Sequence, residues 1–445
     1  MMNKLLCGAA VRDITPTAEM LPLPGGYADG SGYTSVLNPL HVRALALSDQ
    51  QNTALLVIYE MPGVPNPDEF IPMIAEAAQL PRDYVFLSAT HSHAVPMVGR
   101  LPIMNADGKP RFPYQAESAE RQEAYLNLVR EKSVEVAKEA MASMKPAALE
   151  IAFGKSYINL NRNKDFHIRG ELTEDQKKNI VSLGLKIRET EDGPVVTMLG
   201  IDYAGVSDKT LTVLKFADEN GAPIAFLMNH PTHATVMHGN VLHTIDSDFP
   251  GVVSAHMEKQ FPGSAALWCS GAAGDQNPVM KSNNHTPSYE NGLMTFGLNS
   301  EDPKTLLHMI SGTHFDDVMQ TIVHLKPVEA ELDIKSARGS AFPESKNPDD
   351  PCEVEMGLLK IGPVSIITVH GELYNSIGTE LIRQSFTPYA IVMTHTCNTS
   401  NRAGYIPDED GQIRGGWGTC RFKGRGETVQ AAMLETLKDL ESKAR

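Results

Sequence analysis

The sequence lacks the cysteine patterns that mark disulfide frameworks and thiolate metal sites. Its five cysteines, Cys7, Cys269, Cys352, Cys397 and Cys420, are scattered along 445 residues, and no two of them form a CxxC pair. An odd, scattered set of this kind is typical of reduced thiols rather than of a secreted disulfide scaffold. The cysteines therefore favour a cytoplasmic setting.

Long hydrophobic runs are also missing. A membrane-spanning helix needs roughly 18 or more consecutive apolar residues, and no segment approaches that length. Residues 1–7 hold one cation and an apolar stretch too short for a secretory signal. We therefore predict a cytoplasmic protein without stable membrane association.

Positively charged residues are fewer than negatively charged ones. Lys and Arg number 39 against 54 Asp and Glu, which gives a formal net charge of −15. Binding to nucleic acid or to an anionic membrane requires clustered Lys and Arg, and this balance argues against both. The predicted partner is a small-molecule substrate, and the sequence leaves open whether the chain forms a homo-oligomer.

Several catalytic signatures are absent from the chain. There is no HExxH, no GxSxG nucleophile elbow and no GxxxxGK[ST] phosphate loop. The short Gly424-Arg425-Gly426 lacks the third glycine of a dinucleotide fingerprint. These absences argue against a nucleotide-dependent enzyme and against the best-known protease and esterase types.

What the chain does have is an alternation of short apolar runs and helical patterns, which predicts an α/β fold with a mixed sheet flanked by helices. We expect strands at 53–59, 83–88, 223–228, 265–269, 363–369 and 389–393. We expect helices at 118–144, 304–324, 373–384 and 427–443. No sequence repeat is evident, the polar segments 281–303 and 342–351 are interpreted as surface loops, and residues 1–445 are treated as one domain.

Histidines and a glutamate follow four of the predicted strands. These residues are His91 and His93, His230 and His233, His370 and Glu372, and His395. Ligands of α/β proteins collect beyond the carboxyl ends of strands, so this edge of the sheet is the predicted active site. Imidazole and carboxylate suit zinc, which in catalytic sites commonly takes three protein ligands and keeps one position open. For any single histidine, a buried or surface role without metal stays open.

The ordered motifs along the chain resemble the neutral, non-lysosomal ceramidase family. The resemblance runs through Gly8-Ala9-Ala10-Val11-Arg12-Asp13-Ile14-Thr15-Pro16, Ala89-Thr90-His91-Ser92-His93, Asn159-Leu160-Asn161-Arg162, His230-Pro231-Thr232, Asp246-Ser247-Asp248-Phe249-Pro250-Gly251, Gly274-Asp275-Gln276-Asn277-Pro278, Gly371-Glu372 and Ala403-Gly404-Tyr405. Each motif alone is weak, but the set occurs in one order along most of the chain.

The resemblance implies an α/β catalytic domain with one zinc ion per chain, held by His91, His230, Glu372 and Tyr405. It also implies that His93 assists with substrate or proton, and that Arg162 faces the substrate. Asp248 has two interpretations, a helix cap or a residue that orients a ligand histidine. Besides being an implied ligand, Tyr405 is a candidate hydrogen-bond donor to the oxygen of the substrate carbonyl, which becomes negatively charged during hydrolysis.

Two residues depart from the family pattern and are candidate substrate-binding positions. Asn277 stands where the family has an active-site serine, and Trp417 replaces a second tyrosine. The family's C-terminal immunoglobulin-like domain has no counterpart after the helix at 427–443. We therefore do not expect ceramide itself to be the substrate.

The predicted function is zinc-dependent hydrolysis of an amide or ester bond in a soluble N-acyl compound, with metal-activated water as nucleophile. Two alternatives stay open. One is a hydrolase or lactonase that acts on a carbohydrate derivative with the same zinc site. The other is a catalytically silent binding protein that retains the fold.

Overall fold

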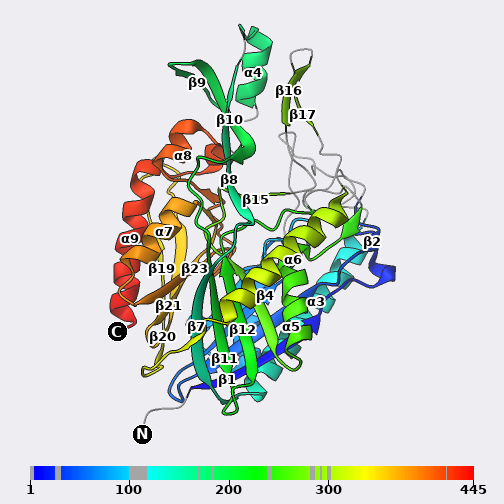
Figure 1. The fold of residues 1–445 in the computed structure, drawn as a ribbon, viewed down its shortest axis with the longest axis vertical. Helices are drawn as coiled ribbons and strands as arrows, with labels where there is room; N and C mark the ends of the chain where they lie inside the picture. The colour runs from blue at the N-terminus through cyan, green and yellow to red at the C-terminus, as the bar shows by residue number, and fades with distance from the viewer. Residues whose placement is uncertain are drawn as a thin grey trace.

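Three β-sheets, each covered by helices, form the body of the molecule in the computed structural model (Figure 1). The structure describes residues 5–25, 32–99, 118–168, 170–182, 185–237, 243–280, 286–290, 293–297, 302–416 and 418–445. The mixed α/β class predicted from the sequence is confirmed.

The first sheet has the order β5-β4-β3-β1-β6. Three strands run antiparallel to their neighbours, a helix then crosses over, and a fourth strand pairs in parallel with the third. A second helix follows. The elements are β1 (Leu6–Asp13), β3 (His41–Ser48), β4 (Thr53–Tyr59), α1 (Pro67–Ala78), β5 (Val85–Ala89) and α3 (Ala119–Ala142).

The other two large sheets repeat this order of elements. In the second sheet they are β7 (Ala148–Lys155), β11 (Thr210–Ala217), β12 (Pro223–His230), α5 (Asp248–Gln260), β14 (Ala265–Ser270) and α6 (Pro303–Ile322). In the third they are β19 (Ile334–Ala341), β20 (Val354–Ile361), β21 (Val364–Val369), α7 (Asn375–Gln384), β23 (Tyr389–Met393) and α9 (Gly426–Lys443). The chain thus contains three topologically equivalent units. The sequence shows no such repeat, because the units share backbone order and not side-chain identity.

The inner faces of the three sheets share one apolar core, to which Leu56, Leu227 and Ile366 contribute fully buried side chains from the three units. The outer faces are covered by paired helices, α1 with α3, α5 with α6, and α7 with α9 (Figure 1). Each sheet is therefore buried on both faces, which explains why its strands appear in the sequence as short continuous apolar runs.

A smaller sheet extends beyond the ends of the central strands, in the upper part of Figure 1. Its order is β15 (Gln276–Pro278), β8 (Asn159–His167), β10 (Gly193–Asp202) and β9 (Ile187–Thr190), and α4 (Glu174–Ser182) lies next to it. The remaining short elements are η1 (Ala18–Met20), β2 (Ser35–Val36), η2 (Arg82–Tyr84), β6 (Lys145–Pro146), β13 (Thr244–Ile245), β18 (Lys326–Pro327), β22 (Glu372–Leu373), β24 (Tyr405–Ile406), α8 (Glu409–Arg414) and η3 (Thr419–Arg421).

The structure corrects the sequence interpretation at two places. The predicted loop 281–303 contains a β-hairpin, β16 (Thr286–Glu290) and β17 (Leu293–Gly297), whose threonine and aromatic residues have high β propensity. The helix α1 is not among the predicted helices; it contains Pro72, a residue that is uncommon inside a helix. The segment 342–351 lies outside the helices and strands, as predicted.

Two sequence expectations about what the chain lacks can be compared with the structure. Within the described residues, no helix has both the length and the apolarity needed to cross a bilayer. All five cysteines belong to the described part of the chain and are free thiols, as the absence of a pairing pattern predicts.

Candidate metal centre

Loops from all three units meet at the carboxyl ends of the strands. The loop after β5 carries His91 and His93, the loop after β12 carries His233, and the loop after β21 carries Glu372. Backbone hydrogen bonds join these loops, for example from His93 N to Ala234 O at 3.2 Å. The predicted edge of the sheet is therefore where the candidate residues gather.

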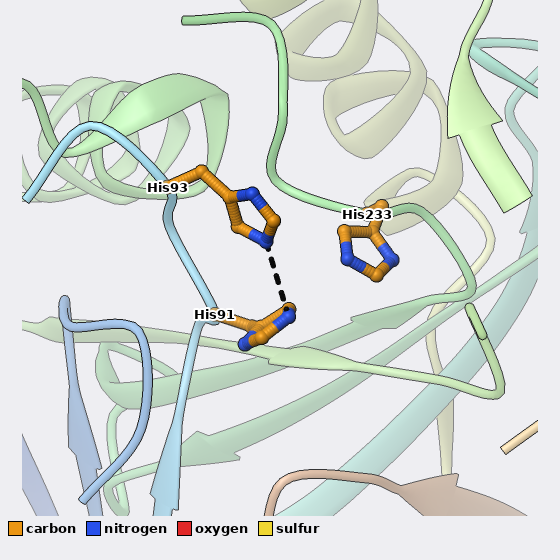
Figure 2. A group of neighbouring side chains, drawn as sticks. All are labelled: His91, His93 and His233. Carbon is orange, nitrogen blue, oxygen red and sulfur yellow. Dashed lines mark hydrogen bonds between the residues drawn. The ribbon is translucent and has the colours of Figure 1, made fainter. Parts of the chain in front are cut away.

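Three histidines form the centre of this group (Figure 2). Potential ligand atoms of His91, His93 and His233 lie within 4.8 Å of one another. Glu372 Oε2 lies 3.6 Å from Nε2 of His91 and 3.6 Å from Nε2 of His233. Ligand atoms of a tetrahedral zinc site with bonds of 2.0–2.1 Å are about 3.3 Å apart, so these separations fit a small cation.

Hydrogen bonds on the far side of two rings fix which nitrogen faces the centre. His91 Nδ1 donates to Pro62 O at 2.7 Å, and His233 Nδ1 donates to Ala273 O at 3.0 Å. A carbonyl oxygen only accepts, so both Nδ1 atoms carry the proton and both Nε2 atoms present a lone pair. In metal sites, the ring nitrogen of a ligand histidine that does not bind the metal commonly donates to a backbone carbonyl in the same way.

Two buried polar atoms at the centre have no hydrogen-bond partner among the described residues. They are Nε2 of His233 and Oε2 of Glu372. An unsatisfied buried acceptor costs about 1–3 kcal/mol, so such atoms are rare unless an ion or water takes up their lone pairs. Two lone-pair atoms aimed at the same point fit a divalent cation.

The electrostatics of the centre favour the protonation states that bind metal. Burial lowers the pKa of His91, and it lowers the pKa of His233 well below the ordinary value. Burial alone would raise the pKa of Glu372, but the guanidinium of Arg402 and the nearby His91 hold it well below its ordinary value. Neutral imidazole and ionised carboxylate are the forms that coordinate a cation without proton release.

His91 and His395 are related by the repeat. Each lies two residues beyond the last paired residue of its parallel strand, and each has a positive φ, 60° and 56° respectively. Their rings stack with centroids 4.0 Å apart and an interplanar angle of 13°. Left-handed backbone at a non-glycine residue costs about 1–3 kcal/mol and clusters at functional sites. Both residues thus have the strained backbone found at functional sites, and the stacking restricts the orientation of the His91 ring.

A second group of predicted residues surrounds Glu372. Strands β22 and β24 pair in parallel with Glu372 opposite Tyr405, which places both side chains on the same face of the pair. Arg162 Nη2 donates to the Tyr405 hydroxyl at 3.0 Å, and Nη1 donates to Asn277 Oδ1 at 3.3 Å. Arg162, Asn277 and Tyr405 are therefore brought together beside the centre.

The structure places His230 outside the histidine group, although the family resemblance implies it as a ligand. His230 Nε2 donates to Ser156 O at 3.1 Å, and Nδ1 accepts from Thr232 Oγ1 at 2.6 Å. Both ring nitrogens are thus engaged, and burial lowers the pKa of this ring to about 3. The chain turns after β12, and His233, three residues further on, belongs to the histidine group.

Asp248 supports the backbone of the His233 loop. Its Oδ2 accepts from Met237 N at 2.9 Å and its Oδ1 from Phe249 N at 2.7 Å, so both oxygens bond to backbone amides. Burial raises the pKa of Asp248 to about 6. Asp248 is the first residue of α5 and follows the N-cap residue Ser247, so it is an acidic residue of the first turn and not the helix cap. Trp417, the other predicted substrate-binding residue, lies outside the described residues.

Comparison with known proteins gives a clear structural match without a sequence match. Neutral ceramidase from Pseudomonas aeruginosa superposes with a TM-score of 0.68 at 15% identity, over 98% of this chain and 74% of that chain. A ceramidase complexed with C2 gives the same four values. No protein-family profile and no curated protein sequence matches the chain. The chain therefore has the fold of the neutral ceramidases.

Proposed function

We propose that this chain is a metal-dependent hydrolase that cleaves the amide or ester bond of a small N-acyl compound. The observation that carries the proposal is the convergence of two buried lone-pair atoms, His233 Nε2 and Glu372 Oε2, which lie beside His91 and have no hydrogen-bond partner among the described residues. The solved neighbours are named as ceramidases, and the sequence resemblance to that family implies an amide hydrolase.

The proposed ligands are His91, His233, Glu372 and Tyr405, which lies opposite Glu372 on the paired strands, and the proposed ion is one zinc per chain. A zinc ion held there would supply a Lewis acid and an activated water near neutral pH. His233 replaces His230 in this ligand set, because among the described residues both ring nitrogens of His230 have partners whereas Nε2 of His233 has none.

His93 is the proposed proton carrier. Its Nε2 lies 3.1 Å from Nε2 of His91, so the His93 ring borders the proposed ligand set without being part of it. An imidazole N–H at this position can donate to a departing amine, and the ring can take up a proton again from solvent. His93 would thus move the proton that amide cleavage requires.

Arg162 and Tyr405 are the proposed donors to the substrate's carbonyl oxygen. The Arg162 guanidinium is fixed by Gly274 O, which accepts from Nε at 3.1 Å and from Nη2 at 2.6 Å. A donor fixed before the reaction stabilises developing negative charge without further reorganisation. Asn277, held by Arg162, would border the bound substrate and influence its choice.

The test combines metal analysis with a substrate panel. We expect about one zinc per purified chain and hydrolysis of at least one N-acyl amide or ester, lost with a chelator and restored by zinc. Glu372→Gln should lose both metal and activity. Glu380→Gln, a carboxylate on the nearby helix α7 that pairs with Arg383, is the matched control and should keep both.

The panel also separates the competing functions. Hydrolysis of sugar lactones alone would replace the N-acyl substrate with a carbohydrate derivative at the same site. A wild-type protein that neither contains nor takes up a divalent ion would contradict the proposal and favour a binding protein. We keep a cytoplasmic location as part of the proposal, to be checked by cell fractionation.

A further inference from the structure

One loop of the third unit leads into the candidate metal centre. This β23–β24 loop comprises residues 394–404. Arg402, near its end, donates from Nη2 to Glu372 Oε1 at 2.6 Å. Tyr405, directly after it, lies opposite Glu372, and its hydroxyl accepts from Arg162 Nη2 at 3.0 Å. The conformation of the loop therefore decides where two of the candidate functional side chains lie.

A buried carboxylate anchors the middle of the β23–β24 loop. It belongs to Glu355 on β20, whose side chain is buried with the residue only 6% exposed. Oε2 of Glu355 accepts from the backbone amides of Asn398 at 3.1 Å and Thr399 at 3.2 Å. Oε1 accepts from the hydroxyl of Thr399. One side chain thus receives three donors from two successive loop residues.

The same carboxylate also contacts the segment that leads to Glu372. His370 Nδ1 donates to Glu355 Oε2 at 3.2 Å, and the backbone amide of His370 donates to Glu355 O at 3.0 Å. Two residues further on, the amide of Glu372 donates to Gly404 O at 2.7 Å. Glu355 therefore joins the two segments that carry Glu372 and Tyr405.

The donors around Glu355 call for an ionised carboxylate. Burial alone would raise the pKa of Glu355, but hydrogen bonds from His370 and Thr399 hold it below its ordinary value. An ionised carboxylate only accepts hydrogen bonds, and donors bond to it more strongly than to a neutral acceptor. A glutamine of the same shape would place an NH2 group against one or more of these donors. The charge of Glu355, and not only its volume, therefore fixes the loop.

Two further carboxylates bond the β23–β24 loop where it is open to solvent. Glu353 Oε2 accepts from Asn401 Nδ2 at 2.9 Å, and Asp68 Oδ1 accepts from Ser400 N at 3.2 Å. Both contacts are exposed, so water can replace either partner and the net contribution of each bond is small. Glu355 differs from them because its bonds are shielded from water.

We infer that Glu355 is a positioning residue for the hydrolysis, and that it holds the β23–β24 loop so that the Tyr405 hydroxyl stays beside Arg162. This inference rests on the proposed hydrolase function and adds to it a residue that acts only through the loop. A misplacement of about 1 Å at an active site can cost on the order of 100-fold in rate. A donor that stabilises developing charge acts in the transition state, so its displacement lowers kcat more than it raises KM.

Kinetics of Glu355→Gln give the first test. In protein saturated with zinc, kcat should fall by about 10-fold or more, as is usual for loss of a supporting partner, while KM changes by less than about 3-fold. Thr399→Val removes only the hydroxyl donor of the loop and should lower kcat by a smaller factor, about 3-fold. It takes the place of Glu355→Gln if that variant does not fold. Glu353→Gln is the matched control and should keep the wild-type kcat.

A second measurement needs neither metal nor turnover. When 3-fluorotyrosine replaces Tyr405, its ¹⁹F chemical shift depends on the guanidinium that is bonded to the hydroxyl. Arg162→Gln in the labelled protein gives the resonance without this contact. The resonance should move toward that position in Glu355→Gln and in Thr399→Val, and it should stay unchanged in Glu353→Gln. A variant that only loses global stability would keep the native resonance in its folded molecules.

The two measurements separate this inference from the hydrolase proposal. If the wild type hydrolyses no compound, the hydrolase proposal fails, and the resonance alone decides whether Glu355 positions Tyr405. An unchanged resonance in Glu355→Gln would overturn the inference, and so would an unchanged kcat in a protein that is active. An equal loss of kcat in Glu353→Gln would also overturn it, because any contact to the loop would then have the same effect.

Discussion

Two histidines three residues apart, at the two ends of one turn after β12, have opposite relations to the candidate centre. Both are buried and both have a lowered pKa, so burial and protonation state do not separate them. The ring of His230 has partners at both nitrogens, whereas Nε2 of His233 has none among the described residues. What distinguishes the candidate ligand is therefore its uncommitted lone pair, and not its residue type or its exposure.

The contacts of the two rings also differ in which units of the molecule they join. His230 joins the end of β12 to the end of β7 through Ser156, so it belongs to the internal packing of the second unit. His233 contacts residues of the first and third units, His91 and Glu372. One histidine stabilises its own unit, and the other connects the three units.

The largest expected difference between the two histidines is in metal binding. His233→Ala should weaken zinc binding by more than about 100-fold, because loss of even a supporting partner costs 10–100-fold. His230→Ala should keep zinc affinity within about 10-fold of wild type. Equilibrium dialysis with elemental analysis measures both.

A reversed result would restore the ligand set implied by the family resemblance. If His230→Ala released the ion and His233→Ala retained it, the turn after β12 would have to rearrange on metal binding. His308→Ala, at an exposed position on α6, is the control and should bind zinc like the wild type.

A smaller difference is expected in the stability of the metal-free protein, and it has the opposite order. His230→Ala leaves Ser156 O without its ring donor and opens a cavity, which should lower the free energy of unfolding by about 2 kcal/mol or more. His233→Ala removes an unsatisfied Nε2 and should cost less. Urea unfolding in the presence of a chelator gives both values, and equal losses would contradict the distinction.

The smallest difference between the two histidines is expected in how the free energy of unfolding depends on pH. Burial lowers the pKa of both rings, so each stays neutral in the folded chain and takes up a proton in the unfolded chain below about pH 6.5. Acid therefore favours unfolding from pH 6.5 downward to the folded-state pKa, while the stability is fully present above pH 6.5. Each such histidine contributes up to about 1.4 kcal/mol per pH unit in that window.

Replacing either histidine in the metal-free protein should reduce the slope of the unfolding free energy against pH by a similar amount. Added zinc should steepen the slope in the wild type and in His230→Ala, because protons then compete with the ion for the ligands. It should not do so in His233→Ala. A zinc-independent slope in the wild type would show that the ion does not bind these rings.

The sequence predicts the parts of the fold and site that depend on local pattern. Strands β4 and β23 begin and end where the apolar runs do, and the residues that follow β5 and β21 include His91, His93 and Glu372 as expected. These positions are predictable because a buried strand and the residue after it are adjacent in the chain.

The remaining features depend on contacts between distant segments. The choice between His230 and His233 rests on the carbonyl of Ser156, at the end of another strand. Arg402 meets Glu372 only because β22 and β24 pair, and no motif marks that arginine. The threefold repeat of elements is likewise visible in the strand order and not in the residues.

The division of the ligand set among three units has a thermodynamic consequence. Because the proposed ligands are His91 of the first unit, His233 of the second and Glu372 of the third, an ion bound by them would have its full set of partners only when all three units are docked. At a free concentration 100 times its Kd, a ligand that binds only the native state adds about 2.7 kcal/mol to stability. Here that energy would belong to the joint docking of the units and to none of them alone. Occupancy of the centre would therefore report the tertiary assembly of the entire chain, and withdrawal of the ion would loosen all three units together.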